Sequence, residues 1–272
     1  MKKIIGCLFL VMTFMSVQSQ TAEEILGKYE TAAGGREKLE AVKTLEVIST
    51  LKMGIMGQAI DLPLTLIREK GKLFRRQIGG IMGMGDSYTI ITDTAGYVFI
   101  PAIRGFGEMQ QGTPASITKI KTEDLVADQY ELDCAGAFGE LVNYAAKGHT
   151  VELQGTQKVN KVVCYKLKMN LKTGQAITYF IDSQTFLVKQ VEALGQMAAN
   201  LTGFGGMMKA FGRDIKKDMK ATMTIKEYQE FNGIKYPVKL TLGLGAVESE
   251  VENTTVKINE SIDEKWYKIG KA

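Results

Sequence analysis

The residues that could perform covalent or acid–base chemistry are few in this chain. His149 is the only histidine, so neither a multi-histidine metal site nor a relay between two histidines can be built from this sequence. The sequence also lacks the GxSxG nucleophile elbow, HExxH, CxxC, a GxGxxG that follows a strand, and a phosphate-binding loop. A lone histidine at the start of a predicted strand is typical of a packing or surface residue.

Paired carboxylates are the one catalytic device that composition leaves open. The neighbouring acids are Glu23 with Glu24, Glu123 with Asp124, and Glu248 with Glu250. The first two pairs stand at expected helix starts and the third on an expected exposed strand face, so each pair has a structural explanation. We therefore predict a protein that is not an enzyme, with no cofactor and no metal.

Two cysteines, Cys134 and Cys164, follow the N-terminal region that holds Cys7. Alternation along VVCYKLKMN places Cys164 on the face opposite Tyr165 and Leu167. In an oxidising compartment the two thiols could pair, and their spacing permits a disulfide without requiring one. A disulfide and two free thiols both remain open at this point.

The first nineteen residues predict export. Two lysines precede an apolar run of about a dozen residues, and a short polar segment follows, which is the order of a secretory signal peptide. The run is shorter than the roughly 20 residues of a membrane-spanning helix. We expect cleavage between Ser19 and Gln20. Loss of Lys2 and Lys3 lowers the formal net charge from +4 to +2, which is too small to predict nucleic-acid binding.

The elements that must position any site begin with a helix over 21–43, capped by Thr21 and interrupted at Gly34 and Gly35. From residue 44 the apolar period changes to two. Strand-like runs follow at 44–53, 59–71, 72–80, 87–93 and 96–101, and, after a helical interlude at about 116–144, at 149–155, 161–171, 176–183, 185–193, 219–231, 234–243 and 247–259.

About a dozen strands with almost no helix between neighbours predict a mainly antiparallel β fold. A sheet of this size has to curl, so we expect a strongly curved, incomplete β-barrel with the helical segments plugging its concave side. No linker rich in proline, glycine and serine divides the chain. Residues 20–272 are therefore predicted to form a single domain that acts as a monomer.

Methionine and glycine concentrate in three unusual segments, and an apolar surface of this composition can change shape. The residues predicted to bind a ligand come from these segments: Met82, Met84, Met197, Leu201, Phe204, Met208 and Phe211. The third segment lies in an insertion at 195–220, where apolar residues recur every three or four positions and lysines gather toward the C-terminal end.

Two interpretations of the insertion remain open. It is either a helix whose apolar stripe closes the sheet, or a mobile lid that touches the ligand or an anionic membrane surface. Its glycines each cost a helix roughly 1 kcal/mol, so a stable isolated helix is not expected and a movable flap is compatible with the composition.

Three stretches, 22–45, 141–190 and 228–242, resemble outer-membrane lipoprotein-sorting protein homologues, the group related to the LolA and LolB carriers. The most specific part is the succession of the strand VVCYKLKMNL, the hairpin KTGQ, the strand ITYFID and a strand that ends in lysine. The resemblance implies an incomplete antiparallel barrel closed by helices, with an apolar cavity for acyl chains and with neither cofactor nor catalysis.

The predicted function is a periplasmic carrier for a lipid or for the acyl chain of an acylated protein. A structural or protein-interaction module of the cell envelope is the alternative, and a hydrolase that uses carboxylates is a third hypothesis. The first predicts an apolar cavity, the second an interior filled by its own side chains, and the third a compact acidic pocket.

Overall fold

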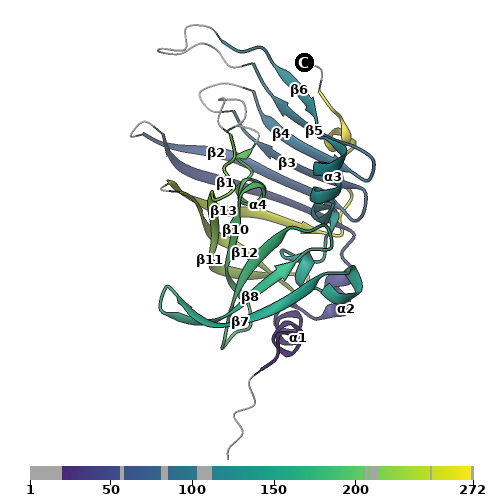
Figure 1. Cartoon of the computed structure of the whole chain (residues 1–272). Helices are drawn as coiled ribbons and strands as arrows, with labels where there is room; N and C mark the ends of the chain where they lie inside the picture. The colour runs from purple at the N-terminus through teal and green to yellow at the C-terminus, as the bar shows by residue number, and fades with distance from the viewer. Residues whose placement is uncertain are drawn as a thin grey trace, which may run out of the picture.

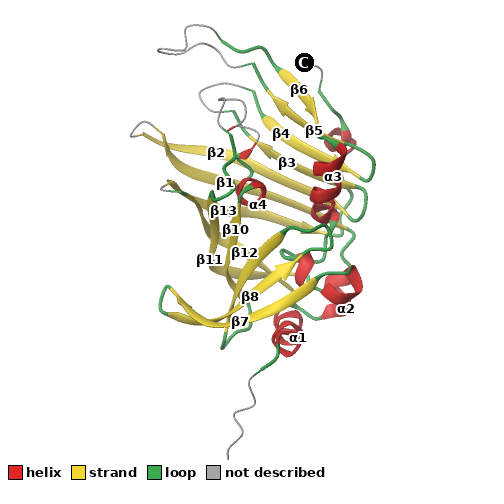
Figure 2. Cartoon of the chain, in the orientation of Figure 1, coloured by secondary structure: helices red, strands yellow, loops and turns green. Residues whose placement is uncertain are grey.

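The computed structural model describes residues 20–55, 58–80, 85–102, 112–205, 208, 214–245 and 247–270. Over these residues the chain forms one antiparallel sheet of thirteen strands. Figure 1 and Figure 2 show the sheet bending round a concave side, with helices along one flank. The predicted fold, a strongly curved antiparallel sheet that does not close into a barrel, is confirmed. The predicted signal peptide at 1–19 lies outside the described residues.

The strands, in chain order, are β1 Thr44–Ile55, β2 Gln58–Glu69, β3 Leu73–Ile78, β4 Ser87–Thr92, β5 Gly96–Ile100, β6 Ser116–Lys119, β7 Thr150–Val159, β8 Val162–Asn170, β9 Ala176–Asp182, β10 Val188–Leu194, β11 Lys220–Phe231, β12 Ile234–Leu244 and β13 Val247–Ile258. The α-helices are α1 Ala22–Ala33, α2 Arg36–Glu40, α3 Thr122–Asp128 and α4 Gln196–Thr202. The 3-10 turns are η2 Gln129–Leu132, η3 Gly139–Leu141, η4 Tyr144–Lys147 and η5 Glu264–Tyr267.

The order of strands puts the two halves of the chain together at the centre of the sheet. β1 pairs with β2 on one side and with β13 on the other, so the first and last strands are neighbours. The two edges of the sheet are then β6 and β7, which follow one another in the chain. The segment that joins them, with α3 and the turns η2 to η4, therefore runs from one edge of the sheet to the other (Figure 1).

That joining segment corrects the predicted helical interlude at 116–144. Ser116–Lys119 is a strand, because Ile117 and Thr118 continue the sheet by pairing with β5. Within this joining segment only α3 is an α-helix, and the stretch FGELVNYAAKG forms short 3-10 turns. Asn143 adopts a left-handed conformation between η3 and η4, which prevents one continuous helix.

The N-terminal helix is confirmed with its break. The Thr21 side chain accepts from the Glu24 N–H, and the Glu24 carboxylate accepts from the Thr21 N–H, which completes a capping box. α1 ends at Ala33, two glycines follow, and α2 begins at Arg36. α1 packs against β7 and β12 on the lower part of the molecule (Figure 2).

Apolar side chains are buried on both faces of the sheet. The main core lies on the concave side, where alternate β1 residues such as Leu45, Val47 and Leu51 are buried. A second cluster covers the convex face of β2 to β5 and includes Ile67 and Tyr88. The C-terminal segment with η5 covers this second cluster. Arg75 stacks on Tyr88 there and donates to the Trp266 and Lys268 carbonyls.

We predict that Gly34→Ala destabilises the fold more than Gly35→Ala does. Gly34 has φ +133°, and an added Cβ would lie 2.4 Å from the Gly233 carbonyl oxygen of the β11–β12 hairpin. Gly35 has φ +97° but open space around the Cβ position. The free energy of unfolding should fall by about 2 to 4 kcal/mol for Gly34→Ala and by about 1 kcal/mol for Gly35→Ala. Urea unfolding followed by circular dichroism measures both, and equal losses would contradict the close approach.

Candidate ligand-binding cavity

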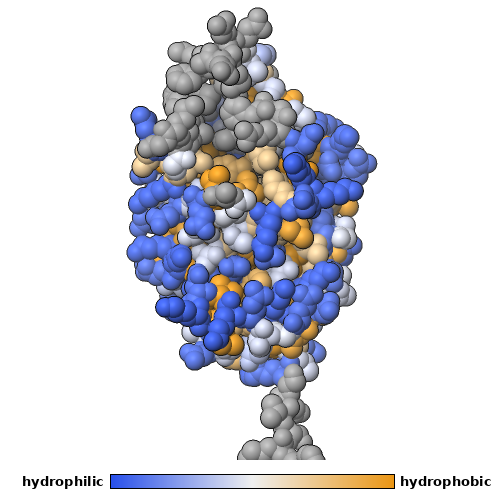
Figure 3. Space-filling model, turned by 60° about the vertical axis from the view of Figure 1, so that its left-hand side comes forward, coloured by the Kyte–Doolittle hydropathy of each residue, from blue (hydrophilic) through white to orange (hydrophobic). Residues whose placement is uncertain are grey.

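A cavity of about 140 Å³ lies on the concave side of the sheet, between the strands, α4 and the segment that joins the two edges. Its walls are mainly apolar and come from both halves of the chain. The lining residues are Val47, Ser49, Leu64, Leu66, Arg68, Arg76, Tyr130, Glu131, Ala137, Phe138, Glu140, Ile177, Tyr179, Val191, Ala193, Met197, Leu201, Thr202, Met223, Tyr236, Pro237, Leu240, Leu242, Val251 and Asn253. Figure 3 shows apolar side chains grouped in the middle of one face, with hydrophilic side chains bordering them.

Strand alternation explains why these residues face the cavity. Leu64, Leu66 and Arg68 occupy every second position of β2, so they share one face of that strand. Leu240 and Leu242 do the same on β12. The same period that lines the cavity with leucines therefore places an arginine at its wall.

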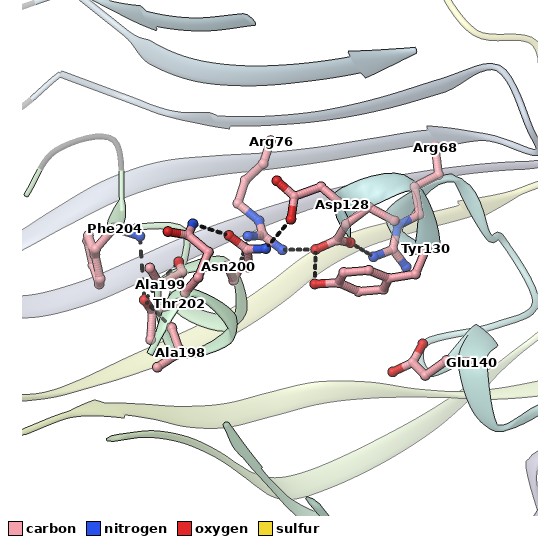
Figure 4. Close-up of polar contacts among 12 residues, drawn as sticks. Arg68, Arg76, Asp128, Tyr130, Glu140, Ala198, Ala199, Asn200, Thr202 and Phe204 are labelled. Carbon is pink, nitrogen blue, oxygen red and sulfur yellow. Dashed lines mark hydrogen bonds and ion pairs between the residues drawn. The ribbon is translucent and has the colours of Figure 1, made fainter. Parts of the chain in front are cut away.

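Arg68 and Arg76, both labelled in Figure 4, form a charged part of the wall together with Glu131. Arg68 Nη2 donates to Glu131 Oε2, and Arg76 Nη2 lies 3.8 Å from Glu131 Oε1. Tyr130 donates its hydroxyl to Glu131 Oε1 at 3.2 Å. Burial lowers the pKa of Arg68, but the surrounding acidic groups, of which the Glu131 carboxylate has the largest effect, together outweigh burial and hold that pKa above its ordinary value. The Arg68 guanidinium therefore stays charged inside a largely apolar wall.

α4 is attached to this polar wall at one point. The Asn200 carbonyl, in the last turn of the helix, accepts from Arg76 Nη1. The Asn200 side-chain amide donates to Asp128 Oδ1 at 2.7 Å, which links α4 to α3 (Figure 4). Gly203 ends α4 with φ +76°, and an added Cβ there would lie 2.7 Å from Arg76 Cδ. Glycine thus both ends the helix and makes room for the arginine.

Glu140 is a second carboxyl on the cavity wall. It lies on η3, and its Oε1 accepts the Tyr179 hydroxyl from β9. Burial raises the pKa of Glu140 to about 7, against the opposing effects of its backbone hydrogen bond and of Arg68. A carboxyl in this state exchanges its proton near neutral pH and could act as an acid or a base. Among the described residues, however, neither a histidine nor a cysteine lines the cavity with it.

The structure brings two of the predicted ligand-binding residues to the cavity. Met197 and Leu201, one turn apart on α4, line it. Phe204 is buried in the main core beside the cavity, and the half-buried Met208 donates its N–H to the Phe204 carbonyl at 2.9 Å. The remaining three, Met82, Met84 and Phe211, lie outside the described residues. Ligand binding by these seven residues stays a prediction.

Of the two interpretations of the insertion, a single helix with one apolar stripe does not fit the described residues. α4 covers seven residues and ends where Gly203 adopts a left-handed conformation, so Phe204 and Ile215 do not share a helix with Met197. Whether the insertion at 195–220 moves as a lid stays a prediction.

The polar wall residues were not among those predicted. Arg68 carried a usable signal, since a charged residue in phase with Leu64 and Leu66 on a strand must face the same side as they do. Glu131 and Glu140 carried no such signal, because they come from irregular turns that bring them to the cavity only after folding.

The cysteines and the histidine take no part in this site. Cys134 and Cys164 are both buried free thiols in separate apolar clusters, and burial raises the pKa of Cys134 to about 12. Cys164 faces away from Leu167, as alternation predicts, but packs with Val159 and Phe180 instead of a second cysteine. His149 Nδ1 accepts from the Lys172 N–H at 3.1 Å, which is a packing role.

Two structural features are absent from the residues that the structure describes. In the part of the chain that the structure describes, His, Cys, Asp and Glu side chains form no cluster of three or more suited to a metal ion. Within those same residues, none of the helices combines the length and apolar character needed to span a membrane.

Comparison with solved structures identifies the fold. A LolA superfamily protein from Nitrosomonas europaea matches with a TM-score of 0.54 at 10% identity, over 92% of this chain and 99% of that one. The chain has the LolA-type fold. The resemblance seen in the sequence is thereby confirmed at the level of the fold.

Two other structures align over similar lengths. A DUF1329 family protein from Desulfovibrio piger matches with a TM-score of 0.47 at 11% identity, over 90% of this chain and 97% of that one. A putative outer membrane lipoprotein-sorting protein domain from Vibrio parahaemolyticus matches with 0.43 at 9% identity, over 90% and 96%. Neither a scan of protein-family models nor a search of curated proteins gave a match to the sequence.

The buried Glu140 carboxyl predicts a pH-dependent loss of stability. Below the ordinary pKa of 4.5 the group is protonated in both the folded and the unfolded chain, so it has no effect. Between 4.5 and about 7 the unfolded chain ionises first, and stability falls until the folded group also ionises. Glu140→Gln should therefore gain melting temperature relative to wild type as the pH rises from about 4 to about 8.

The matched control is Glu152→Gln, which removes the same charge from an exposed position on β7. Its melting temperature should follow that of the wild type across the same pH range. Thermal melts followed by circular dichroism measure both variants. A constant difference between Glu140→Gln and wild type at all pH values would contradict the raised pKa.

Proposed function

We propose that this protein is an exported, non-enzymatic carrier that holds a lipid, or the acyl chain of a lipoprotein, in the concave-side cavity. The observation that supports this most directly is the apolar cavity itself, which lies on the concave side of a LolA-type fold and is bordered by α4. Leucines of both β2 and β12 line this cavity, whose walls are mainly apolar. Such a surface binds apolar chains by removing them from water.

The size of the cavity adds a condition to this function. Each buried methylene contributes about 0.8 kcal/mol, so a few of them already give useful affinity. An engineered cavity of about 150 Å³ in another protein accepts one benzene molecule. A cavity of about 140 Å³ therefore holds a segment of an acyl chain, and a whole chain requires it to widen. The proposal assigns this movement to α4, because α4 is short and lines the cavity through Met197 and Leu201.

Export to the periplasm follows from the N-terminal residues and belongs to the same proposal. Contact with a membrane surface would bring the cavity to its cargo. Lys216 and Lys217, which follow α4, are exposed and free to approach anionic head groups.

A cavity-filling substitution tests the proposal. Leu66→Trp places a larger side chain in a cavity of about 140 Å³ and should lower the affinity for a neutral apolar dye by about tenfold. Thr65→Trp, one residue away on β2 and pointing to the other face, should leave that affinity unchanged. Fluorescence titration measures both variants, and thermal melts check that each remains folded.

Native mass spectrometry of the protein released from its own envelope provides the complementary observation. Co-purified lipid that is reduced in Leu66→Trp supports a carrier. An apo mass, together with no uptake of dye by the wild type, would overturn the proposal.

A protein-interaction module remains the second candidate, and one feature favours it. β7 is an edge strand of ten residues, and most of its side chains are exposed. An edge of this length can pair with an extended segment of another protein. Crosslinking in the native envelope distinguishes the two candidates, since a single stoichiometric partner that crosslinks at β7 in lipid-free protein would favour the interaction module.

A further inference from the structure

The cavity wall carries two cations on neighbouring strands. Leu66 pairs with Arg76 and Phe74 pairs with Arg68, so the two arginines lie diagonally across the β2–β3 ladder on the same face. Their side chains are only 11% and 18% exposed. The centroid of the Phe74 ring lies 5.5 Å from the Arg68 guanidinium carbon and 5.2 Å from that of Arg76. These cation–π contacts help to orient both guanidinium groups.

These two cations share one carboxylate. Glu131 accepts a hydrogen bond from Arg68, but its other oxygen lies 3.8 Å from Arg76 Nη2, beyond hydrogen-bond distance. The acceptor that Arg76 does reach is the uncharged Asn200 carbonyl. Arg68 Nε is buried and has no acceptor among the described residues. The arginines thus have more buried donor capacity than Glu131 satisfies, and such unsatisfied groups are costly.

The other acidic groups nearby do not supply the acceptors that the two arginines lack at the wall. Asp128 accepts from the Asn200 side chain at 2.7 Å and is not one of the residues that line the cavity. Glu140 faces the cavity, and burial raises its pKa to about 7, so at neutral pH it is only partly ionised. Tyr130 and Tyr236, which also line this part of the cavity, are neutral hydroxyl groups.

We propose that the cavity selects amphiphiles with an anionic oxygen-acid head group, a carboxylate or a phosphate, bound by Arg76 and Arg68 while the chain lies along the leucines of β2 and β12. This deepens the proposed function and rests on it. A guanidinium presents parallel N–H donors that match two oxygens of a carboxylate or phosphate. Arg76 is the better placed of the two, because its side chain is the more exposed and its carboxylate contact is the longer.

The first experiment uses the wild-type mature chain and displacement of a neutral dye, N-phenyl-1-naphthylamine. The competitors share a sixteen-carbon chain and differ in the head group: palmitate, hexadecyl phosphate, hexadecanol and methyl palmitate. The anionic competitors should displace the dye at concentrations about tenfold lower than the neutral ones, because only they form charge-assisted hydrogen bonds. The stronger of palmitate and hexadecyl phosphate identifies which acid the site prefers.

The outcomes separate this inference from the function on which it rests. Equal displacement by anionic and neutral competitors overturns the head-group inference and leaves the carrier intact. Failure of the dye and of every competitor to bind overturns both. Acetate and inorganic phosphate at the same concentrations should displace nothing, and displacement by either would instead mean a free-anion site and overturn the proposal of an amphiphile.

The second experiment tests whether Arg76 causes the preference for anionic head groups. Arg76→Gln should weaken palmitate and hexadecyl phosphate by about tenfold, and Arg76→Lys should weaken them less, because the charge remains and the planar fork is lost. Arg75→Gln is the matched control. It removes the same charge from the adjacent position of β3, whose side chain stacks on Tyr88 on the convex face, and the preference should persist.

An anionic preference that survives in Arg76→Gln, or that disappears equally in Arg75→Gln, would overturn the assignment. Thermal melts establish that each variant is folded. The wild-type head-group series decides the proposal even if a variant fails to fold.

Discussion

The path of the chain between the two edges of the sheet controls the rest of this structure. Because β6 and β7 are consecutive in the chain yet lie at opposite edges of the sheet, the segment between them has to run from one edge to the other. That segment delivers Tyr130, Glu131 and Glu140 to the concave side. An open antiparallel sheet supplies the curvature, and this one connection supplies the polar groups of the cavity.

The cavity therefore combines two kinds of wall with different physical origins. The strands contribute leucines in alternation, which bind by the hydrophobic effect and discriminate weakly between apolar chains. The turns contribute carboxyl groups that meet arginines from the strands, and these charged groups supply direction and selectivity. Arg76 connects the two kinds of wall to α4 through the Asn200 carbonyl. Binding at the wall and the position of α4 are for this reason parts of one arrangement.

The small cavity is closed in part by a short helix, because Met197 and Leu201 of the seven-residue α4 line it. α4 has seven residues and lies between Gly195 and Gly203, which both have positive φ, and its buried residues pack against β10 and β11. The convex face is built differently: there the C-terminal segment packs on the cluster that contains Tyr88 and accepts hydrogen bonds from Arg75. The convex face thus carries the C-terminal segment, and the concave face carries the main core together with α4.

The sequence by itself determined the strands, the capped N-terminal helix with its break at Gly34, and the curved antiparallel sheet, because these depend on local periodicity and on glycine and capping chemistry. Helical spacing in the sequence also pointed to Met197 and Leu201, which both line the cavity. The sequence pattern predicted helix for Ser116–Lys119, which is a strand. A strand of four residues is defined by its pairing with β5 and not by its own residues. Only the tertiary structure decided that Arg68, Arg76, Glu131 and Glu140 meet at one cavity. They lie on different elements, and their contacts arise from the long connection between the edges, which no local pattern encodes.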